Sequence, residues 1–272
     1  MIIALYTRYL EESARHHFNQ LVEILQKYQI EYDEVSDPLP QRHYDFLFSI
    51  GGDGTLLSSV HLLGNRNIPV LGINFGHLGF LTTAGRNDLD SLVADLTAHR
   101  YTLEPRTLLH VVASHSDNQL VSSALNEVSL HRLDDDTILR TDLYVDSDFV
   151  ATYSGDGLIV ATPTGSTAYS LSCGGPILTP NCGCFVITPI AAHNLTLRPI
   201  IVPDTASLRL VTHPKPQLFN LGMDSRRQHL ACGTEISISR QDFTISLVRL
   251  NNQNFFTAIP EEAGLLSFSV GS

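Results

Sequence analysis

Ile50-Gly51-Gly52-Asp53-Gly54-Thr55 is the stretch that decides the fold of the first part of this chain. It follows a short apolar run over residues 44–50 and precedes a candidate helix over residues 56–63. An apolar run that ends in paired glycines predicts a buried strand turning into a helix. Glycines let the backbone turn tightly and approach a ligand, and the amides at a helix start favour phosphate.

Asp53 stands at the apex of this turn, where its carboxylate would repel a phosphate unless a metal ion or a proton-donating hydroxyl lies between them. That combination indicates phosphoryl transfer, in which the turn holds the phosphates and Asp53 handles a proton or Mg²⁺. The alternative is structural, because an aspartate at this point can also cap the helix through its side chain. The short motif alone leaves both interpretations open.

The composition is that of a globular protein. The chain has 272 residues, of which 43% are hydrophobic and 17% charged, enough for one large domain or two ordinary ones. Its 17 basic and 28 acidic side chains give a net charge of −11, which argues against a nucleic-acid partner. A phosphate site in this chain therefore depends on backbone amides, a metal ion and a few local cations.

Targeting and redox signals are weak. Apolar runs such as residues 185–190 are too short to span a membrane, and no basic region precedes an apolar segment at the N-terminus. The spacing of the four cysteines matches no zinc or redox motif, so we expect reduced thiols. These features predict a cytoplasmic protein without a membrane partner.

Strands and helices alternate in the first part of the chain. The expected strands cover residues 2–6, 44–50 and 68–74, and the expected helices cover residues 11–28, 56–63 and 88–97. This alternation predicts a doubly wound parallel sheet, an α/β domain over residues 1–104. The loops at Asp53 and His77 both leave carboxyl ends of strands, where such sheets bind ligands.

The sequence pattern changes near Pro105, where the alternation of expected strands and helices ends. Short β-rich runs follow, at 108–114, 120–125, 128–131, 141–145, 158–161, 207–212, 235–239 and 244–249. They predict a β-rich, sandwich-like domain over residues 105–252, with one short helix near Thr167 capped by Thr164 or Ser166. The segment 253–272 could return to the first domain.

Three further motifs lie in the β-rich part. Asn126-Glu127 falls in an expected exposed turn, and Gly155-Asp156-Gly157 precedes an apolar run. Residues 162–176 are dense in hydroxyl groups and glycine, which can bind an anion or a sugar without added charge. Taken singly, Asn126-Glu127 is an ordinary turn dipeptide, and the stretch 162–176 is explained better by a capped helix in an ordinary loop than by a binding function.

Taken together and in order, these motifs closely resemble those of NAD kinases. The resemblance also includes residues 76–80, Thr188–Leu195 and Arg198-Pro199, and it runs from about Phe46 to Asp224. Diacylglycerol kinases, sphingosine kinases and 6-phosphofructokinases share the aspartate turn. Diacylglycerol kinases and phosphofructokinases lack the stretch 162–169 and the Asn-Glu pair.

The chain departs from the family pattern at two points. Ser58 stands where some relatives carry an arginine, so the cation that meets the donor phosphates is left open. Asp224-Ser225-Arg226 stands where the family has Asp-Gly-Gln or Asp-Ser-Gln.

The resemblance implies transfer of the γ-phosphoryl group of ATP to the 2′-hydroxyl of the adenosine ribose of NAD, with Mg²⁺ or another divalent cation. Asp53 would be the base, and the amides around Gly52, Gly54 and Thr55 would meet the donor phosphates. The residues implied for NAD binding are Gly54, Phe80, Asn126, Glu127, Asp156, Thr167, Ala168, Tyr169, Ser170, Leu171, Ser172 and Ala191. Family members are homo-oligomers, which implies a homodimer or homotetramer in which Asp156 reaches the substrate of a neighbouring subunit.

No metal-binding side chain is assigned. His77 and His193 lack paired ligands at short spacing, and Asp134–Asp136 is typical of a solvated loop. Two alternatives to an NAD kinase stay open. A lipid kinase would need a basic or amphipathic surface, and a non-catalytic NAD(P)-binding protein would not need Asp53.

Overall fold

The fold was obtained as a computed structural model. It describes residues 1–9, 12–76, 79–82, 85, 89–116, 118–133, 138–215, 217–250 and 255–256. His77, Leu78, Asp134–Asp136 and the segment 257–272 lie outside the described residues. The chain forms two compact units, Met1–Pro105 together with the chain from Ile245, and Arg106–Thr244.

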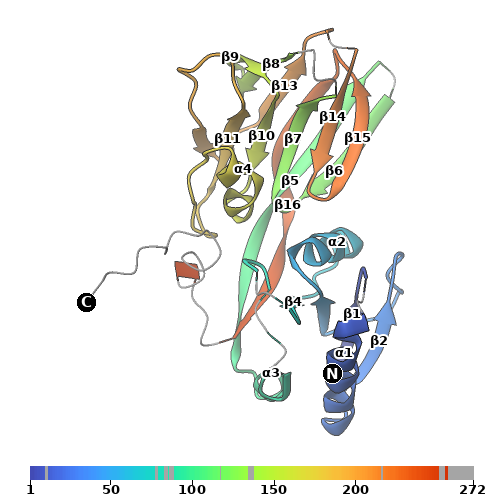
Figure 1. Cartoon of the computed structure of the whole chain (residues 1–272). Coiled ribbons are helices and arrows are strands. Elements are labelled where there is room, and N and C mark those ends of the chain that lie inside the picture. The colour runs from blue at the N-terminus through green and yellow to red at the C-terminus, as the bar shows by residue number, and fades with distance from the viewer. Residues whose placement is uncertain are drawn as a thin grey trace, which may run out of the picture. The chain divides into compact units, whose positions relative to one another are not determined.

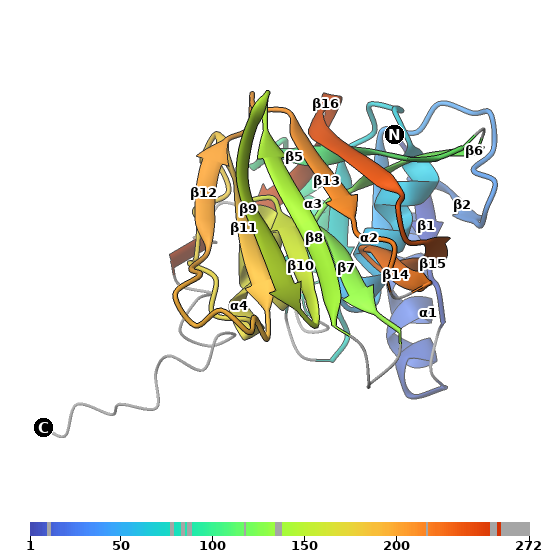
Figure 2. The same cartoon turned by 90° about the horizontal axis from the view of Figure 1, so that it is seen from above.

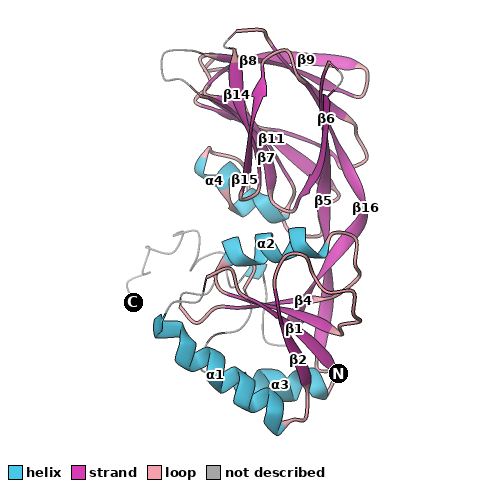
Figure 3. Cartoon of the chain, turned by 90° about the vertical axis from the view of Figure 1, so that its right-hand side faces the viewer, coloured by secondary structure: helices cyan, strands magenta, loops and turns pink. Residues whose placement is uncertain are grey.

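The first unit is built on a parallel sheet. Its strands are β1 (Ile2–Tyr6), β2 (Glu31–Val35), β3 (Phe46–Ile50) and β4 (Val70–Ile73), in the order β2-β1-β3-β4. The end of β16 (Glu235–Leu250) joins β4 in parallel, with Leu247 opposite Val70. Helix α2 (Asp53–Leu63) lies on one side of the strands, and α1 (Glu12–Lys27) and α3 (Leu89–Thr97) lie on the other (Figure 3). The predicted doubly wound α/β sheet is confirmed.

Burial explains why these segments form this sheet. Every residue of β3 and β4 is buried, as expected for parallel strands covered on both faces. Helix α1 turns Phe18, Leu21 and Leu25 into the same core, since these residues recur at helical spacing. The predicted helix over 56–63 begins earlier than expected, at Asp53, so the motif aspartate belongs to the helix itself.

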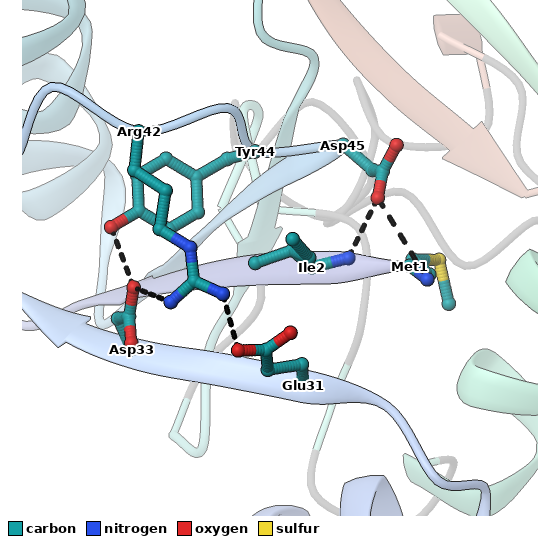
Figure 4. A network of polar contacts seen from close by, with 7 residues as sticks. All are labelled: Met1, Ile2, Glu31, Asp33, Arg42, Tyr44 and Asp45. Carbon is teal, nitrogen blue, oxygen red and sulfur yellow. Dashed lines mark hydrogen bonds and ion pairs between the residues drawn. The ribbon is translucent and has the colours of Figure 1, made fainter.

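A polar network covers the edge of this sheet (Figure 4). Arg42 donates hydrogen bonds to Glu31 and Asp33 of the edge strand β2, and the Tyr44 hydroxyl donates to Asp33 at 2.8 Å. Asp45 accepts the backbone amide of Ile2 at 2.6 Å. These charges tie the segment before β3 to the edge strand and disfavour pairing with another chain.

The second unit is a β-sandwich. One sheet contains the start of β16 followed by β13 (Leu208–Thr212), β8 (Leu139–Val145) and β9 (Asp148–Gly155). The other is antiparallel, in the order β12 (Ile200–Pro203), β11 (Cys184–Ile190), β10 (Gly157–Ala161), β7 (Glu127–Arg132), β14 (Leu218–Met223) and β15 (Arg226–Ala231). Figure 2 shows β8, β9 and β13 drawn over β7, β10 and β11.

One apolar core fills the space between these two sheets. Leu143 and Leu210 come from the first sheet, and Leu130, Phe185 and Phe219 come from the second. The predicted β-rich, sandwich-like architecture is confirmed. The chain passes from one unit to the other in β5 (Tyr101–His115), which pairs with β6 (Asn118–Ala124), and returns in β16 (Figure 1).

Several local predictions for this unit are wrong or incomplete. The two runs expected at 235–239 and 244–249 form the single strand β16. Five strands of this unit were not predicted, β9, β11, β12, β14 and β15, and neither was β2 of the first unit. β15 consists largely of polar and exposed residues, so its sequence shows no strand pattern. In β11, Pro189 interrupts the apolar run, and proline is unusual inside a central strand.

The predicted helix near Thr167 is split into a 3₁₀ turn, η1 (Thr164–Thr167), and a short helix, α4 (Tyr169–Ser172). The expected capping by Thr164 or Ser166 is wrong. Ala168 is the residue before α4, and no side chain caps it. The Ser166 hydroxyl instead donates to the Pro163 carbonyl and accepts the Leu178 amide, so it braces the loop that follows.

No helix among the described residues combines the length and the apolar character needed to cross a membrane.

Candidate active site

Asp53 is the first residue of α2, directly after β3 and the glycine turn. Gly52 is the N-cap residue, and no side chain caps the helix. The helix-cap interpretation of Asp53 is therefore wrong. Its carboxylate instead accepts the backbone amide of Leu81, which donates to Oδ1 at 3.2 Å.

The electrostatic setting of Asp53 suits a proton acceptor. Burial raises the pKa of its carboxyl group above the ordinary value, because the charged form loses hydration. The amides of residues 80–82 and the charge of Arg249 lower the same pKa. The result is an aspartate that is held by amides and is a stronger base than an exposed one.

Two glycines bring the loop of residues 79–82 close to Asp53. A methyl group added at Gly79 would lie 2.6 Å from Asp53 Cγ, so only glycine fits beside the carboxylate. At Gly72 on β4, an added methyl group would lie 2.9 Å from the Leu81 carbonyl oxygen. The close packing of the loop on β4 thus places the Leu81 amide at Asp53.

The start of α2 offers amides to an anion. The amides of Thr55 and Leu56 donate to the Gly52 carbonyl at 2.9 and 3.3 Å. Within the described residues, the amides of Asp53 and Gly54 have no acceptor, as is general for the first residues of a helix. The helix start also carries the positive end of the helix dipole, which favours phosphate.

Arg249 on β16 lies at this candidate site and was not identified from the sequence. Its guanidinium donates to Glu104 at 3.1 Å and to the Phe80 carbonyl at 3.3 Å, and its charge acts on Asp53. Ser58, which replaces an arginine of some relatives, donates its hydroxyl to the Gly54 carbonyl at 3.1 Å. No motif surrounds Arg249, so no local signal could have identified it.

In the second unit, the turn between β6 and β7 carries Asn126 and Glu127. Asn126 is only 7% exposed, so the prediction that it lies in an exposed turn is wrong. The turn is buried because Thr162 donates its amide to the Asn126 carbonyl at 2.9 Å and its hydroxyl to the Leu125 carbonyl at 2.6 Å. The hydroxyl-rich stretch therefore packs directly on the Asn-Glu turn.

Two side-chain oxygens of this turn are buried without a hydrogen-bond partner among the described residues, Asn126 Oδ1 and Glu127 Oε2. Burial, with a smaller effect of the Asp224 charge, raises the pKa of Glu127 to about 8. Buried polar groups are normally satisfied, and exceptions indicate a site for a ligand or water. A protonated Glu127 can donate as well as accept at neutral pH.

This pKa predicts a pH effect on stability. Between the ordinary carboxyl pKa of 4.5 and about 8, the unfolded chain loses the Glu127 proton while the folded chain retains it. The unfolding free energy should therefore fall as pH rises through this window, and Glu127→Gln should remove that part of the slope. Urea unfolding at about pH 5.5 and about pH 8.5 measures it, with Glu235→Gln as an exposed control. Equal slopes in wild type and Glu127→Gln would contradict the assignment.

The remaining residues implied for NAD binding lie along the same unit. The Tyr169 ring stacks on His131, with 5.5 Å between centroids, and Ser170 is buried in a 2.8 Å hydrogen bond with Thr188. Thr167 donates to the Thr164 carbonyl at 3.3 Å, Leu171 is half-buried and Ser172 is exposed. Ala168 joins η1 to α4.

Asp156 and Ala191 meet at one end of β11. The Asp156 amide donates to the Ile190 carbonyl at 3.0 Å, next to Ala191, which has a positive φ of 44°. The Asp156 carboxylate is paired with Arg132 at 2.7 Å.

The structure thus brings the implied residues together in two sets. The first unit holds Asp53, Phe80 and the residues implied for the donor phosphates, Gly52, Gly54 and Thr55. The others belong to the second unit, where Asn126 and Glu127 contact the stretch that begins at Thr162. Described residues contain no group of three side chains of the His, Cys, Asp or Glu type that could hold a metal.

A doubly wound sheet with a glycine-flanked aspartate and open amides at a helix start defines a phosphoryl-transfer enzyme of the kinase class. Family models identify which kinase. The ATP-NAD kinase N-terminal domain matches residues 5–101, and the ATP-NAD kinase C-terminal domain matches residues 125–250. The chain belongs to the NAD kinase family.

Individual relatives agree with this assignment. The chain is 41% identical to an NAD kinase of Cytophaga hutchinsonii over 79% of its own length and 74% of the relative. It is 35% identical to an NAD kinase of Christiangramia forsetii over 95% and 96%.

Two solved structures are similar in fold. One is yeast NADH kinase complexed with NADH, with a TM-score of 0.90, 25% identity and coverage of 100% of this chain and 90% of that one. The other is an NAD kinase from Archaeoglobus fulgidus in complex with ATP, with a TM-score of 0.77, 27% identity and coverage of 94% and 96%.

Proposed function

We propose that this chain transfers the γ-phosphoryl group of ATP to the 2′-hydroxyl of the adenosine ribose of NAD and so forms NADP. The observation that carries the proposal is the desolvated Asp53 carboxylate at the start of α2, beside two amides that no described residue uses. Family membership supplies the substrates, and the geometry of the first unit supplies the catalytic group.

Asp53 serves as the base in this proposal. A ribose hydroxyl is a weak nucleophile, so a carboxylate in hydrogen-bond reach assists as the proton leaves. The raised pKa of Asp53 improves its basicity, while the amides of residues 80–82 fix its direction. The amides of Gly54 and its neighbours then receive phosphate oxygens of ATP.

The second unit receives NAD. Asn126 and Glu127 offer buried oxygens that need partners, and hydroxyl and amide groups of a dinucleotide can supply them. Tyr169, whose ring is stacked on His131 in the same unit, is a further proposed contact to the dinucleotide. Thr167, Ala168, Ser170, Leu171, Ser172, Phe80 and Ala191 remain proposed lining residues, and Asp156 remains a proposed contact to the substrate of a neighbouring subunit in a homodimer or homotetramer.

A divalent cation fits this donor set when it arrives with ATP. Mg²⁺ is usually held by substrate phosphates, water and one or two carboxylates, rather than by a protein cage. Asp53 offers such a carboxylate, and the first unit has no group of three metal ligands among its described residues. Mg²⁺ would supply charge neutralisation of the transferring phosphoryl group. We also propose that the protein is located in the cytoplasm.

An assay with a panel of phosphoryl donors tests the proposed activity. The purified chain is mixed with NAD and Mg²⁺, and with ATP, other nucleoside triphosphates or polyphosphate, and NADP is detected with an NADP-specific dehydrogenase. We expect NADP with ATP and none after EDTA. A chain that binds NAD but forms no NADP with any donor would instead be a non-catalytic NAD(P)-binding protein. Replacing NAD by NADH in the same assay fixes the substrate preference.

A further inference from the structure

The hairpin turn between β14 and β15 carries Asp224, which departs from ordinary backbone geometry. Its φ is 51°, a left-handed conformation that costs free energy for most residues and is tolerated best by glycine, asparagine and aspartate. Strained residues of this kind persist where the surrounding structure holds them, and they cluster at functional sites. The hydrogen-bond partners of Asp224 therefore indicate why this backbone conformation is maintained.

The Asp224 carboxylate holds the backbone of the Asn126–Glu127 turn. It accepts the amides of Leu125 and Asn126 at 2.8 Å each and that of Glu127 at 3.2 Å. The amide of Asp224 donates in return to the Glu127 carbonyl at 3.1 Å. Four hydrogen bonds thus fix three consecutive residues from a position 99 residues away from Leu125.

Arg226 supports this arrangement from the same turn. It donates to the Ser122 hydroxyl at 2.7 Å and to the Ser123 carbonyl, on the strand that enters the Asn126–Glu127 turn. Its positive charge favours the ionised form of Asp224, which burial disfavours. A buried carboxylate requires such compensation, so Arg226 helps Asp224 to remain an acceptor for three amides.

We propose that Asp224, assisted by Arg226, is a positioning residue for NAD, because its carboxylate holds the Asn126–Glu127 turn in the geometry that receives the dinucleotide. This inference rests on the proposed function, which places NAD on Asn126 and Glu127. The turn that it fixes holds the two buried oxygens without partners among described residues. Fixing the backbone therefore fixes the groups that a ligand must meet.

The charge of Asp224 also acts on its neighbour Glu127, whose pKa is raised mainly by burial. It contributes to the raised pKa of Glu127, and Arg226 in turn acts on Asp224. Asp224 accepts hydrogen bonds from three backbone amides, which favour its carboxylate form, whereas the Glu127 carboxyl group has no such donors among the described residues and retains its proton more readily. A change at Asp224 must therefore alter the pH at which Glu127 ionises.

Asp224→Asn tests the inference. Asparagine tolerates a positive φ and keeps one acceptor oxygen, so the fold should survive by circular dichroism, but the charge is lost. We expect the dissociation constant of NAD, by calorimetry, to rise about ten- to a hundredfold, while the KM for ATP stays unchanged. The pH profile of NAD affinity should also shift to lower pH, which loss of a merely structural contact would not cause.

Asp146→Asn is the matched control. Asp146 also has a positive φ, 55°, lies in the hairpin turn between β8 and β9, and accepts one backbone amide, that of Ser207 at 3.0 Å. Its replacement should leave NAD affinity and its pH profile unchanged. Equal weakening of NAD binding in both variants would overturn the inference, as would wild-type NAD affinity in Asp224→Asn.

Asn126→Ala separates this inference from the proposed function. If it loses NAD affinity while Asp224→Asn binds normally, the NAD site stands and the positioning role fails. If both bind NAD normally, the proposed NAD site fails as well. If Asp224→Asn does not fold, Arg226→Met decides. It keeps the length of the side chain but removes the charge and the hydrogen bonds to Ser122 and Ser123, so weaker NAD binding supports the role and unchanged binding ends it.

Discussion

Asp53→Asn is expected to lower turnover by roughly 10²–10⁴-fold while NAD still binds. Asparagine preserves the size of the side chain and an oxygen that accepts the Leu81 amide, so α2 and the loop of residues 79–82 should keep their places. It cannot accept a proton. A base acts on the transition state more than on ground-state binding, so the loss should fall on kcat rather than on NAD affinity.

The metal dependence of the same variant separates two roles of Asp53. If the carboxylate acts chiefly as a Mg²⁺ ligand, raising the metal concentration should restore part of the turnover. If it acts as a base, turnover should stay low at every metal concentration. Asp95→Asn, in α3 of the same unit, provides a control for loss of a charge away from the turn. Near-normal turnover of Asp53→Asn would remove the catalytic role.

Gly165→Ala is expected to destabilise the second unit severely and to abolish NAD binding. A methyl group at this position would lie 2.7 Å from Asn126 Cα and would overlap the Asn126 carbonyl group. These atoms are backbone, so no side-chain rotation relieves the clash. Overpacking of a closed site typically costs about 1–3 kcal/mol and can cost more, and here it falls on the turn that carries Glu127.

Urea unfolding and calorimetry with NAD measure this effect. Gly183→Ala is the matched control in the same unit, since its added methyl group would meet no atom closer than 3.8 Å. We expect the control to match wild type in both measurements. A stable Gly165→Ala that binds NAD normally would show that the hydroxyl-rich stretch does not need its close contact with Asn126.

The sequence predicted the first unit well because its signals are local. Buried parallel strands appear as unbroken apolar runs, and α1 shows the helical spacing of Phe18, Leu21 and Leu25. The second unit was predicted in class but not in detail. Strands such as β15 lie at an edge, carry polar residues on both faces and resemble loops in a single sequence.

The candidate active site likewise contains residues with a local sequence signal and residues without one. Asp53 and its glycines form a continuous motif, since a turn that approaches phosphate must be built from adjacent residues. Arg249 and Asp224 act on partners far away in the sequence; Arg249 and Glu104 are 145 positions apart. No periodicity or spacing signals such a contact, and the family resemblance included Asp224 in a motif that departs at Arg226 without giving either residue a role. The burial of Asn126 was missed because its cover, the stretch from Thr162, comes from another strand connection.

We propose that this chain phosphorylates the 2′-hydroxyl of the adenosine ribose of NAD. Two NAD analogues test this choice of hydroxyl, one lacking that 2′-hydroxyl and one lacking the neighbouring 3′-hydroxyl. With ATP and Mg²⁺, phosphoryl transfer from labelled ATP is measured for each. We expect transfer to the 3′-deoxy analogue and none to the 2′-deoxy analogue, although the latter binds. Transfer to the 2′-deoxy analogue at the rate seen with NAD would contradict it.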